Sequence, residues 1–201
     1  MRLPRLSLVV VTLALLGNVH RADAFDADAA FARGGFVLSL EGGYGQQFNP
    51  WHETITGFDF FNAGVRFGFL PWGAVGSGAF KGAFEIGFEP IYQRFFEPEK
   101  EKAFFAGLGA VARYHILPLG RFVPYVELGA APGYTDLNSR EQQTNVVFLL
   151  FAGVGASFFV AEQTALYAGY RLQHVSNAGT SSPNQGINSH TGVIGVSFFF
   201  H

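Results

Sequence analysis

The chain has 201 residues, which is room for one domain, and it contains no cysteine. Lys and Arg number 13 against 15 Asp and Glu, so no excess of positive charge is present to bind a nucleic-acid backbone. The missing cysteine excludes disulfides, cysteine–metal sites and a thiol nucleophile. Charged residues make up only 14%, mean hydropathy is +0.22 and 24 residues are Phe, a composition that excludes a disordered chain.

The N-terminal segment has the three parts of a secretory signal peptide. Two arginines lie among the first five residues, residues 6–16 are apolar, and Ala-Asp-Ala at 22–24 is a typical cleavage site. The alternative is an N-terminal anchor helix, but the apolar stretch is too short to span a bilayer. The sequence therefore predicts a signal peptide over 1–24 and a mature domain over 25–201.

From Phe36 onward, apolar residues alternate with polar or small ones, which is the period of a strand and not of a helix. No apolar run in this part reaches the roughly 20 residues of a membrane helix. Eight strands are expected, near 36–46, 58–70, 80–91, 103–115, 122–132, 145–159, 164–174 and 190–200. Long polar connections follow every second strand, and shorter or Gly-rich ones lie between, as in outer-membrane barrels. The predicted fold is all-β, an eight-stranded antiparallel transmembrane β-barrel.

The predicted strands separate their side chains by charge. In strand 58–70, for example, Phe61 and Phe67 alternate with Asn62 and Arg66, so the apolar row is assigned to lipid and the polar row to the lumen. The charged residues expected in the lumen are Glu41, Arg66, Glu85, Glu89, Arg113, Glu127 and Arg171. Side chains fill the interior of an eight-stranded barrel, so these charges predict a buried ion-pair network; the alternative, a proton or ion path, is disfavoured.

Two polar residues, His174 and Ser176, interrupt a lipid-facing row. They are two positions apart on or just after strand 164–174, and they continue the row of Leu166, Ala168, Tyr170 and Leu172. With a periplasmic N-terminus this strand ends at the cell surface, so the pair is expected on the outer wall, beside the outer-leaflet head groups. A polar side chain facing lipid costs free energy unless it is paired or interfacial. An interfacial His that caps the strand with a loop Ser is the alternative interpretation.

The stretch around this pair reads His174-Val-Ser-Asn-Ala-Gly179, followed by Pro183-Asn-Gln-Gly-Ile-Asn188. It resembles the lipid A 3-O-deacylases, the PagL-like outer-membrane acyl hydrolases. The motif covers residues 171–190, and the eight-strand layout and the signal peptide match over the rest. The resemblance implies a barrel in the outer membrane that hydrolyses an ester-linked acyl chain of lipid A in lipopolysaccharide, without a metal or another cofactor.

The resemblance also implies roles for individual residues. His174 would be the general base and Ser176 the nucleophile, because a serine hydroxyl attacks an ester only when a neighbouring base takes its proton. Asn177, Gly179 and Asn184 would stabilise the oxyanion or position the substrate. His190 would position a substrate phosphate or the catalytic His, or would be an ordinary interfacial His.

One position departs from the family pattern. In the family member that best matches this pattern, a Glu fourteen residues after the His orients the imidazole, whereas this chain has Asn188 at that position. Asn can accept a hydrogen bond from the ring, but it cannot stabilise the imidazolium by charge. Asp136 and Glu141, in the preceding outer loop, are alternatives for the missing acid.

Two other functions remain open at this stage. The first is a non-catalytic barrel, structural or adhesive, and the second is an acyltransferase that acts on the same lipid. The expected partners are lipid A and outer-membrane lipid and not nucleic acid, while the oligomeric state stays open, with a homodimer as one option.

Overall fold

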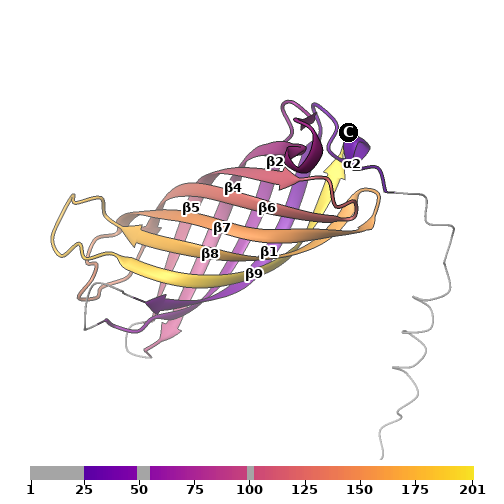
Figure 1. Cartoon of the computed structure of the whole chain (residues 1–201). Helices are drawn as coiled ribbons and strands as arrows, with labels where there is room; N and C mark the ends of the chain where they lie inside the picture. Colours follow the sequence, from indigo (N-terminus) through magenta and orange to yellow (C-terminus); the bar gives the residue numbers. More distant parts are fainter. Residues whose placement is uncertain (1–24, 49–54, 99–101) are drawn as a thin grey trace, which may run out of the picture.

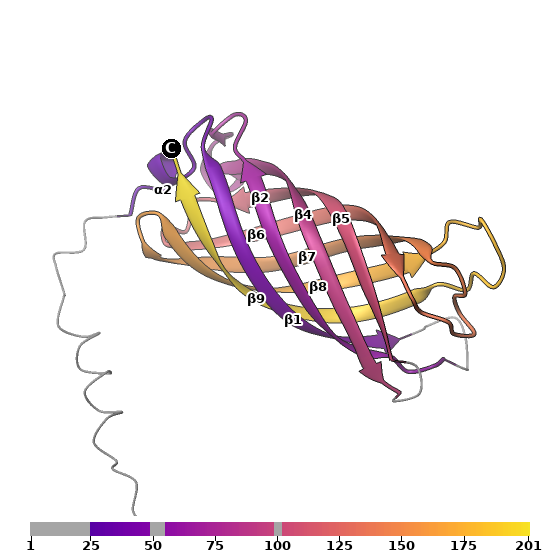
Figure 2. The same cartoon turned by 180° about the vertical axis from the view of Figure 1, so that it is seen from behind.

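The computed structural model describes residues 25–48, 55–98 and 102–201, so the expected signal peptide 1–24 lies outside the described residues. The described residues form one antiparallel sheet that closes into a barrel (Figures 1 and 2). Its elements are α2 (Ala27–Ala30), β1 (Phe36–Phe48), β2 (Asp59–Phe69), β3 (Ala74–Val75), η1 (Gly78–Phe80), β4 (Gly82–Glu97), β5 (Ala103–Ile116), β6 (Phe122–Thr135), β7 (Val146–Ala161), β8 (Thr164–Ser176) and β9 (Ile187–Phe200).

The described residues confirm the predicted architecture of eight long strands. Successive long strands pair with each other, and β1 pairs with β9. β2 pairs directly with β4, and the two-residue strand β3 pairs with the first residues of β4, so the sheet has no long free edge. Closure of this kind satisfies the backbone hydrogen bonds without water, which a bilayer demands. None of the helices in the described parts of the chain is long and apolar enough to cross a membrane.

Most strands differ from the prediction at one or both ends, and two of these differences, in β8 and β9, matter for function. The strand expected at 80–91 begins at Gly82, because residues 78–80 form a 3-10 turn. β8 continues to Ser176 and β9 begins at Ile187, so the ladder extends beyond the expected ends. The reason is that Val175 and Ile187 are paired and buried, and they contribute to the apolar core inside the barrel mouth. Asn188 therefore lies in a strand and not in the loop expected at 175–189.

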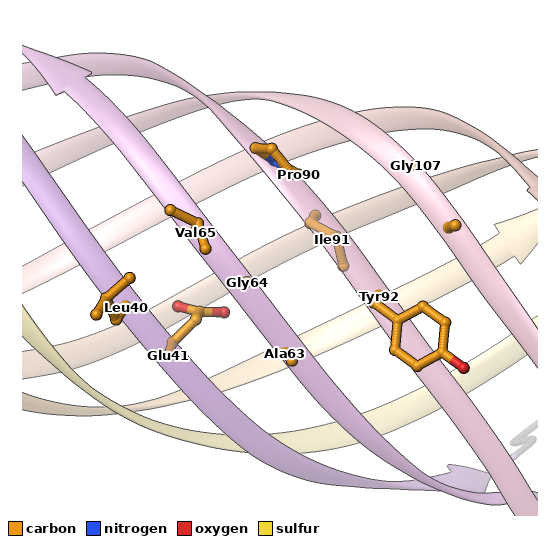
Figure 3. A pocket seen from close by; sticks show the side chains of 10 residues that line it. Leu40, Glu41, Ala63, Gly64, Val65, Pro90, Ile91, Tyr92 and Gly107 are labelled. Atoms are coloured by element: carbon orange, nitrogen blue, oxygen red, sulfur yellow. The ribbon is translucent and has the colours of Figure 1, made fainter.

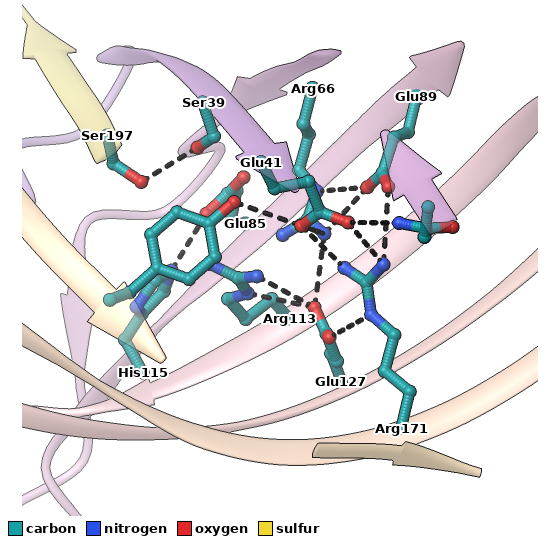
Figure 4. Close-up of polar contacts among 12 residues, drawn as sticks. Ser39, Glu41, Arg66, Glu85, Glu89, Arg113, His115, Glu127, Arg171 and Ser197 are labelled. Carbon is teal, nitrogen blue, oxygen red and sulfur yellow. Dashed lines mark hydrogen bonds and ion pairs between the residues drawn. The ribbon is translucent and has the colours of Figure 1, made fainter. Parts of the chain in front are cut away.

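The lumen holds the charged residues that the sequence assigns to it. All seven are buried, and six of them form the predicted ion-pair network, while Glu85 pairs with His115 (Figure 4). Arg66 Nη2 lies 2.6 Å from a Glu89 oxygen, and Arg171 Nε lies 2.7 Å from Glu127 Oε1. Buried charges are tolerated only when they are paired in this way. The lumen is therefore a packed polar core, and the exposed apolar side chains form the outer wall.

The two ends of the barrel are closed differently. At one end the short helix α2 lies across the opening with Ala30 buried, and the fully buried ring of the following residue, Phe31, packs against Phe159 and Phe199. The C-terminus lies at this α2 end, whereas the loop between β8 and β9 extends from the opposite end (Figure 1). We call the opposite end the loop end.

Candidate active site

His174 and Ser176 lie on the outer wall of the barrel, near the loop end of β8. Both side chains are half-buried, and the residue between them, Val175, points into the barrel and is buried. On the same outer row, Leu172 is 47% exposed. The structure thus places the pair on the apolar outer surface, as the alternation predicts.

The imidazole of His174 has a partner on the next strand. His174 and Asn188 are opposite each other in the β8–β9 ladder, and Nδ1 lies 2.8 Å from Asn188 Oδ1. A carbonyl oxygen can only accept a hydrogen bond, so the contact requires the proton on Nδ1. In the neutral imidazole this tautomer leaves Nε2 as the acceptor nitrogen, which is the atom that a general base uses.

Gly186 lies against the imidazole, and sequence reasoning assigned it no role. A Cβ at this position would come within 2.5 Å of His174 Cε1 and 3.1 Å of Nε2. The residue also has φ +73°, a conformation that favours glycine. In the sequence, the glycine of the Pro-Asn-Gln-Gly motif was the only indication of this role. The structure shows that the imidazole occupies the space that a side chain at this position would need.

Ser176 lies on the same row as His174, two residues further along the strand. Strand residues two apart are separated by about 7 Å along the chain, a span that an imidazole side chain can bridge. Within the described residues no hydrogen bond yet joins the two side chains. Such bonds are often long in ligand-free enzymes and tighten when substrate binds.

Asn177 organises the loop that follows Ser176. Its side chain is buried, its Nδ2 donates to the Ser181 carbonyl at 2.9 Å, and its Oδ1 accepts from Gly179 N at 2.9 Å. The turn reverses the chain at Ala178 and Gly179, which both have positive φ. Asn177 and Gly179, two of the three residues expected to stabilise the oxyanion, therefore bind each other and shape the loop.

Asn184 has a different place in the same loop. Its Oδ1 accepts a hydrogen bond from the backbone N–H of Asn177, the residue after Ser176, at 3.1 Å. Its side-chain Nδ2 has no hydrogen-bond partner within the described part of the chain, and the residue is exposed. The amide is therefore anchored beside the serine with its donor side available.

His190 lies exposed on the lipid-facing surface of β9, two residues further from the loop end than Asn188. Its Nδ1 is hydrogen-bonded to the hydroxyl of Tyr170, and its ring stacks on Phe48 with centroids 3.8 Å apart. It is opposite Leu172 in the ladder and makes no contact with His174 that would orient the imidazole. This geometry fits substrate positioning better than assistance to the base.

The two alternative acids are both engaged elsewhere. Asp136 accepts a hydrogen bond from the backbone of Phe104 at 2.7 Å, and Glu141 accepts two from Thr56 at 2.7 Å each. Neither carboxylate contacts His174, so Asn188 is the side chain that orients the imidazole. Among the residues that the structure describes, no three His, Asp or Glu side chains converge as a metal site would require.

A shallow apolar groove of about 410 Å³ runs beside His174. Its lining comes from β1, β7, β8 and β9 and consists of Phe48, Leu150, Phe151, Ala152, Leu172, Gln173, His174 and Asn188. Leu150 and Leu172 are each about half exposed on its surface. The groove is open to the surroundings of the barrel, so a hydrocarbon chain could reach the imidazole from the side.

A larger groove of about 600 Å³ lies on another part of the wall, across β1, β2, β4 and β5 (Figure 3). Its floor is made of small residues such as Ala63, Gly64 and Gly107, and Leu40 and Tyr92 flank it. It contains no Ser or His, and its one carboxylate, Glu41, belongs to the lumen network. Of the two grooves, the smaller one therefore lies beside the candidate catalytic residues.

Comparison with solved structures supports the fold. The chain is similar to the outer membrane enzyme PagL (17% identity, 79% of this chain and 97% of that one, TM-score 0.59). It is also similar to Neisserial surface protein A (13%, 84% and 99%, TM-score 0.55) and to Ail, the attachment invasion locus protein of Yersinia pestis (16%, 84% and 100%, TM-score 0.52). None of the curated proteins compared with the sequence matches it.

The family profile described as lipid A 3-O-deacylase (PagL) matches residues 33–197, which is most of the chain. That match covers all eight long strands almost completely, together with the loop that carries the candidate site. With the closed barrel, the profile match identifies an outer-membrane protein and an ester hydrolase. The chain belongs to the lipid A 3-O-deacylase (PagL) family.

Proposed function

We propose that the chain removes an acyl chain from lipid A by serine-dependent hydrolysis, with Ser176 as the nucleophile and His174 as the base. The observation that carries the proposal is the hydrogen bond between His174 Nδ1 and Asn188 Oδ1. It fixes the tautomer that can take a proton from a serine hydroxyl, on the same outer row as Ser176. The family profile supports a 3-O-linked chain as the one removed.

The reaction follows from this arrangement. His174 Nε2 takes the proton of Ser176 Oγ as the oxygen attacks the ester carbonyl, and the resulting tetrahedral oxyanion needs a donor. The imidazolium then returns the proton to the sugar oxygen, which leaves as an alcohol, and the acyl chain stays on the serine. A water molecule, deprotonated by His174, hydrolyses this acyl-enzyme and releases the fatty acid.

Asn184 is our candidate for the oxyanion donor. Its Oδ1 is tied to the backbone N–H of Asn177, so the Nδ2 donor is held next to the nucleophile without a competing partner in the described residues. A donor that is fixed before reaction stabilises the developing charge at little reorganisation cost. Asn177 and Gly179 contribute by shaping the loop.

The groove beside His174 supports a route for the substrate. Lipid A is itself a membrane lipid, and the groove opens on the lipid-facing wall, so the substrate can enter sideways without leaving the bilayer. Leu150, Leu172 and Phe48 would contact the acyl chain, and the exposed side of His190 would face the substrate beside them. The site would thus work at the height of the outer-leaflet head groups.

The test uses Ser176→Ala and His174→Ala in cells that make a substrate lipid A, with the mass of lipid A as the readout. Wild-type protein is expected to produce lipid A that lacks one acyl chain, and both variants should leave the lipid unchanged. If both variants still remove the chain, the assignment of the two residues is wrong. Lipid A that is unchanged by the wild type would favour a non-catalytic barrel, and a gain of acyl mass would favour an acyltransferase.

A further inference from the structure

Glu141 is an unusual residue for an outer loop, because its side chain is completely buried. Its carboxylate accepts hydrogen bonds from Thr56 N and Thr56 Oγ1 at 2.7 Å each, and Gln47 Nε2 lies 3.4 Å away. No Lys or Arg of the described residues forms an ion pair with it. A buried carboxylate without a cation persists only where several donors are directed at it.

The donors come from a part of the chain far away in sequence. Gln47 lies near the end of β1, and its Oε1 accepts from the backbone of Gly57 and Phe58, so it also orders the segment before β2. Glu141 therefore joins the loop between β6 and β7 to the segment between β1 and β2. Burial raises the pKa of Glu141, but the hydrogen bonds from Thr56 outweigh it and hold that pKa below its usual value. The group is ionised at neutral pH.

The backbone of Glu141 also contacts the β8–β9 loop, which carries Asn184. Glu141 O accepts the N–H of Gln185 at 3.0 Å, and the next residue, Gln142, forms a β-bridge with Asn184. These contacts join the β6–β7 loop to the β8–β9 loop at the loop end of the barrel (Figure 1). Asn184 is in turn bonded to the backbone beside Ser176.

We infer that Glu141 is a positioning residue: its carboxylate holds the β6–β7 loop in place, and that loop holds the Asn184 amide beside the nucleophile. This inference rests on the proposed function. It differs from the role that sequence analysis allowed for Glu141, because the carboxylate orients the oxyanion donor and not the imidazole. A donor used only in the transition state affects kcat more than KM. Loss of the contact between Glu141 and Thr56 should therefore lower kcat.

The decisive variants are at Thr56, because they leave the carboxylate in place. Thr56→Val keeps the shape and removes the hydroxyl, whereas Thr56→Ser keeps the hydroxyl. Loss of this one charge-assisted hydrogen bond is expected to lower kcat about 3- to 10-fold with KM changed less than about 2-fold, and Thr56→Ser should retain the wild-type kcat. The rates are measured with purified folded protein in detergent, with lipid A as substrate and the released fatty acid quantified by mass spectrometry.

Glu141→Ala extends the test, with Glu162→Gln as its control. Because a shift of about 1 Å can cost about 100-fold in rate, we expect Glu141→Ala to lower kcat roughly 10- to 100-fold. Glu162 pairs with Arg121 on the exposed surface at the α2 end, so its variant should be as active as the wild type. If Glu141→Ala fails to fold, the kcat of Thr56→Val alone tests the inference.

A double-mutant cycle tests the route through Asn184. In an Asn184→Ala background, Thr56→Val should have little further effect on kcat, because the donor it positions is already absent. An undiminished effect in that background would overturn the inference, as would an unchanged kcat in Thr56→Val. An inactive wild type would instead refute the proposed function, and that result is seen before any variant is compared.

Discussion

In the lumen, Arg171 donates to three carboxylates, those of Glu41, Glu89 and Glu127, and each of these carboxylates accepts from at least one further side chain. On the outer wall, His174 has one partner, Asn188, and its second nitrogen is left without one in the described residues. Both regions break the apolar pattern of the strands. Polar groups that bind one another stabilise a fold. A polar group beside an apolar groove that still has an atom without a hydrogen-bond partner is available to a substrate.

The largest expected effect tests the structural side of this comparison. Arg171→Met would leave Glu41 and Glu127 buried with too few partners, and removal of one member of a buried ion pair costs about 3–5 kcal/mol in free energy of unfolding. Urea unfolding of the detergent-folded barrel measures this loss. Arg94→Met, on the exposed face of β4, is the control and should change stability by less than about 0.5 kcal/mol.

The comparison further requires that the folded Arg171→Met protein keep its rate of deacylation within a few-fold of wild type. A loss of activity like that of Ser176→Ala, in protein shown to be folded, would mean that the lumen network takes part in the chemistry. The division between a structural lumen and a functional wall would then be wrong.

The second effect concerns the residue that departs from the family pattern. Asn188→Ala removes the acceptor that holds the Nδ1 tautomer, and kcat is expected to fall about 100-fold, less than the roughly 10⁴-fold measured when a charged triad acid is removed from a serine protease. Asn188→Glu keeps an acceptor and adds a charge that stabilises the imidazolium, so activity should be kept or raised. Steady-state rates on lipid A measure both.

Complete loss of activity in Asn188→Glu would contradict this explanation, because it would show that the amide itself is required. Thermal stability of both variants serves as the control. His174 and Asn188 lie on the surface of the barrel and outside the lumen network, so the unfolding temperature of both variants should stay close to that of the wild type.

The smallest effect tests the groove. Ala152→Trp would fill the space beside Leu172 with an indole and should lower kcat/KM about 10-fold by excluding the acyl chain, since about 1.4 kcal/mol of binding is one factor of ten. Ala168→Trp is the matched control, because Ala168 is an exposed alanine on β8 outside the groove lining. Equal losses in both variants would point to a general effect on the wall and not to occupation of the groove.

Much of the molecule can be predicted from sequence because a strand sorts its side chains with a period of two. Arg66 alternates with Phe67, and Glu127 with Val126 and Leu128, so the lumen and the outer wall can be assigned before any strand is paired. The same rule places His174 and Ser176 on the lipid side. Their roles came from resemblance to a family, since a His and a Ser two apart are a weak signal alone.

The sequence by itself determined the fold class, the lumen charges and the row that carries His174 and Ser176, because these depend on local alternation. Tertiary structure alone decided which residues meet across strands and loops. Asn188 reaches His174 only because buried Val175 and Ile187 extend the β8–β9 ladder. Glu141 faces Thr56, 85 residues away along the chain, and not the imidazole. Such contacts depend on strand register and loop packing, which no spacing in the sequence encodes.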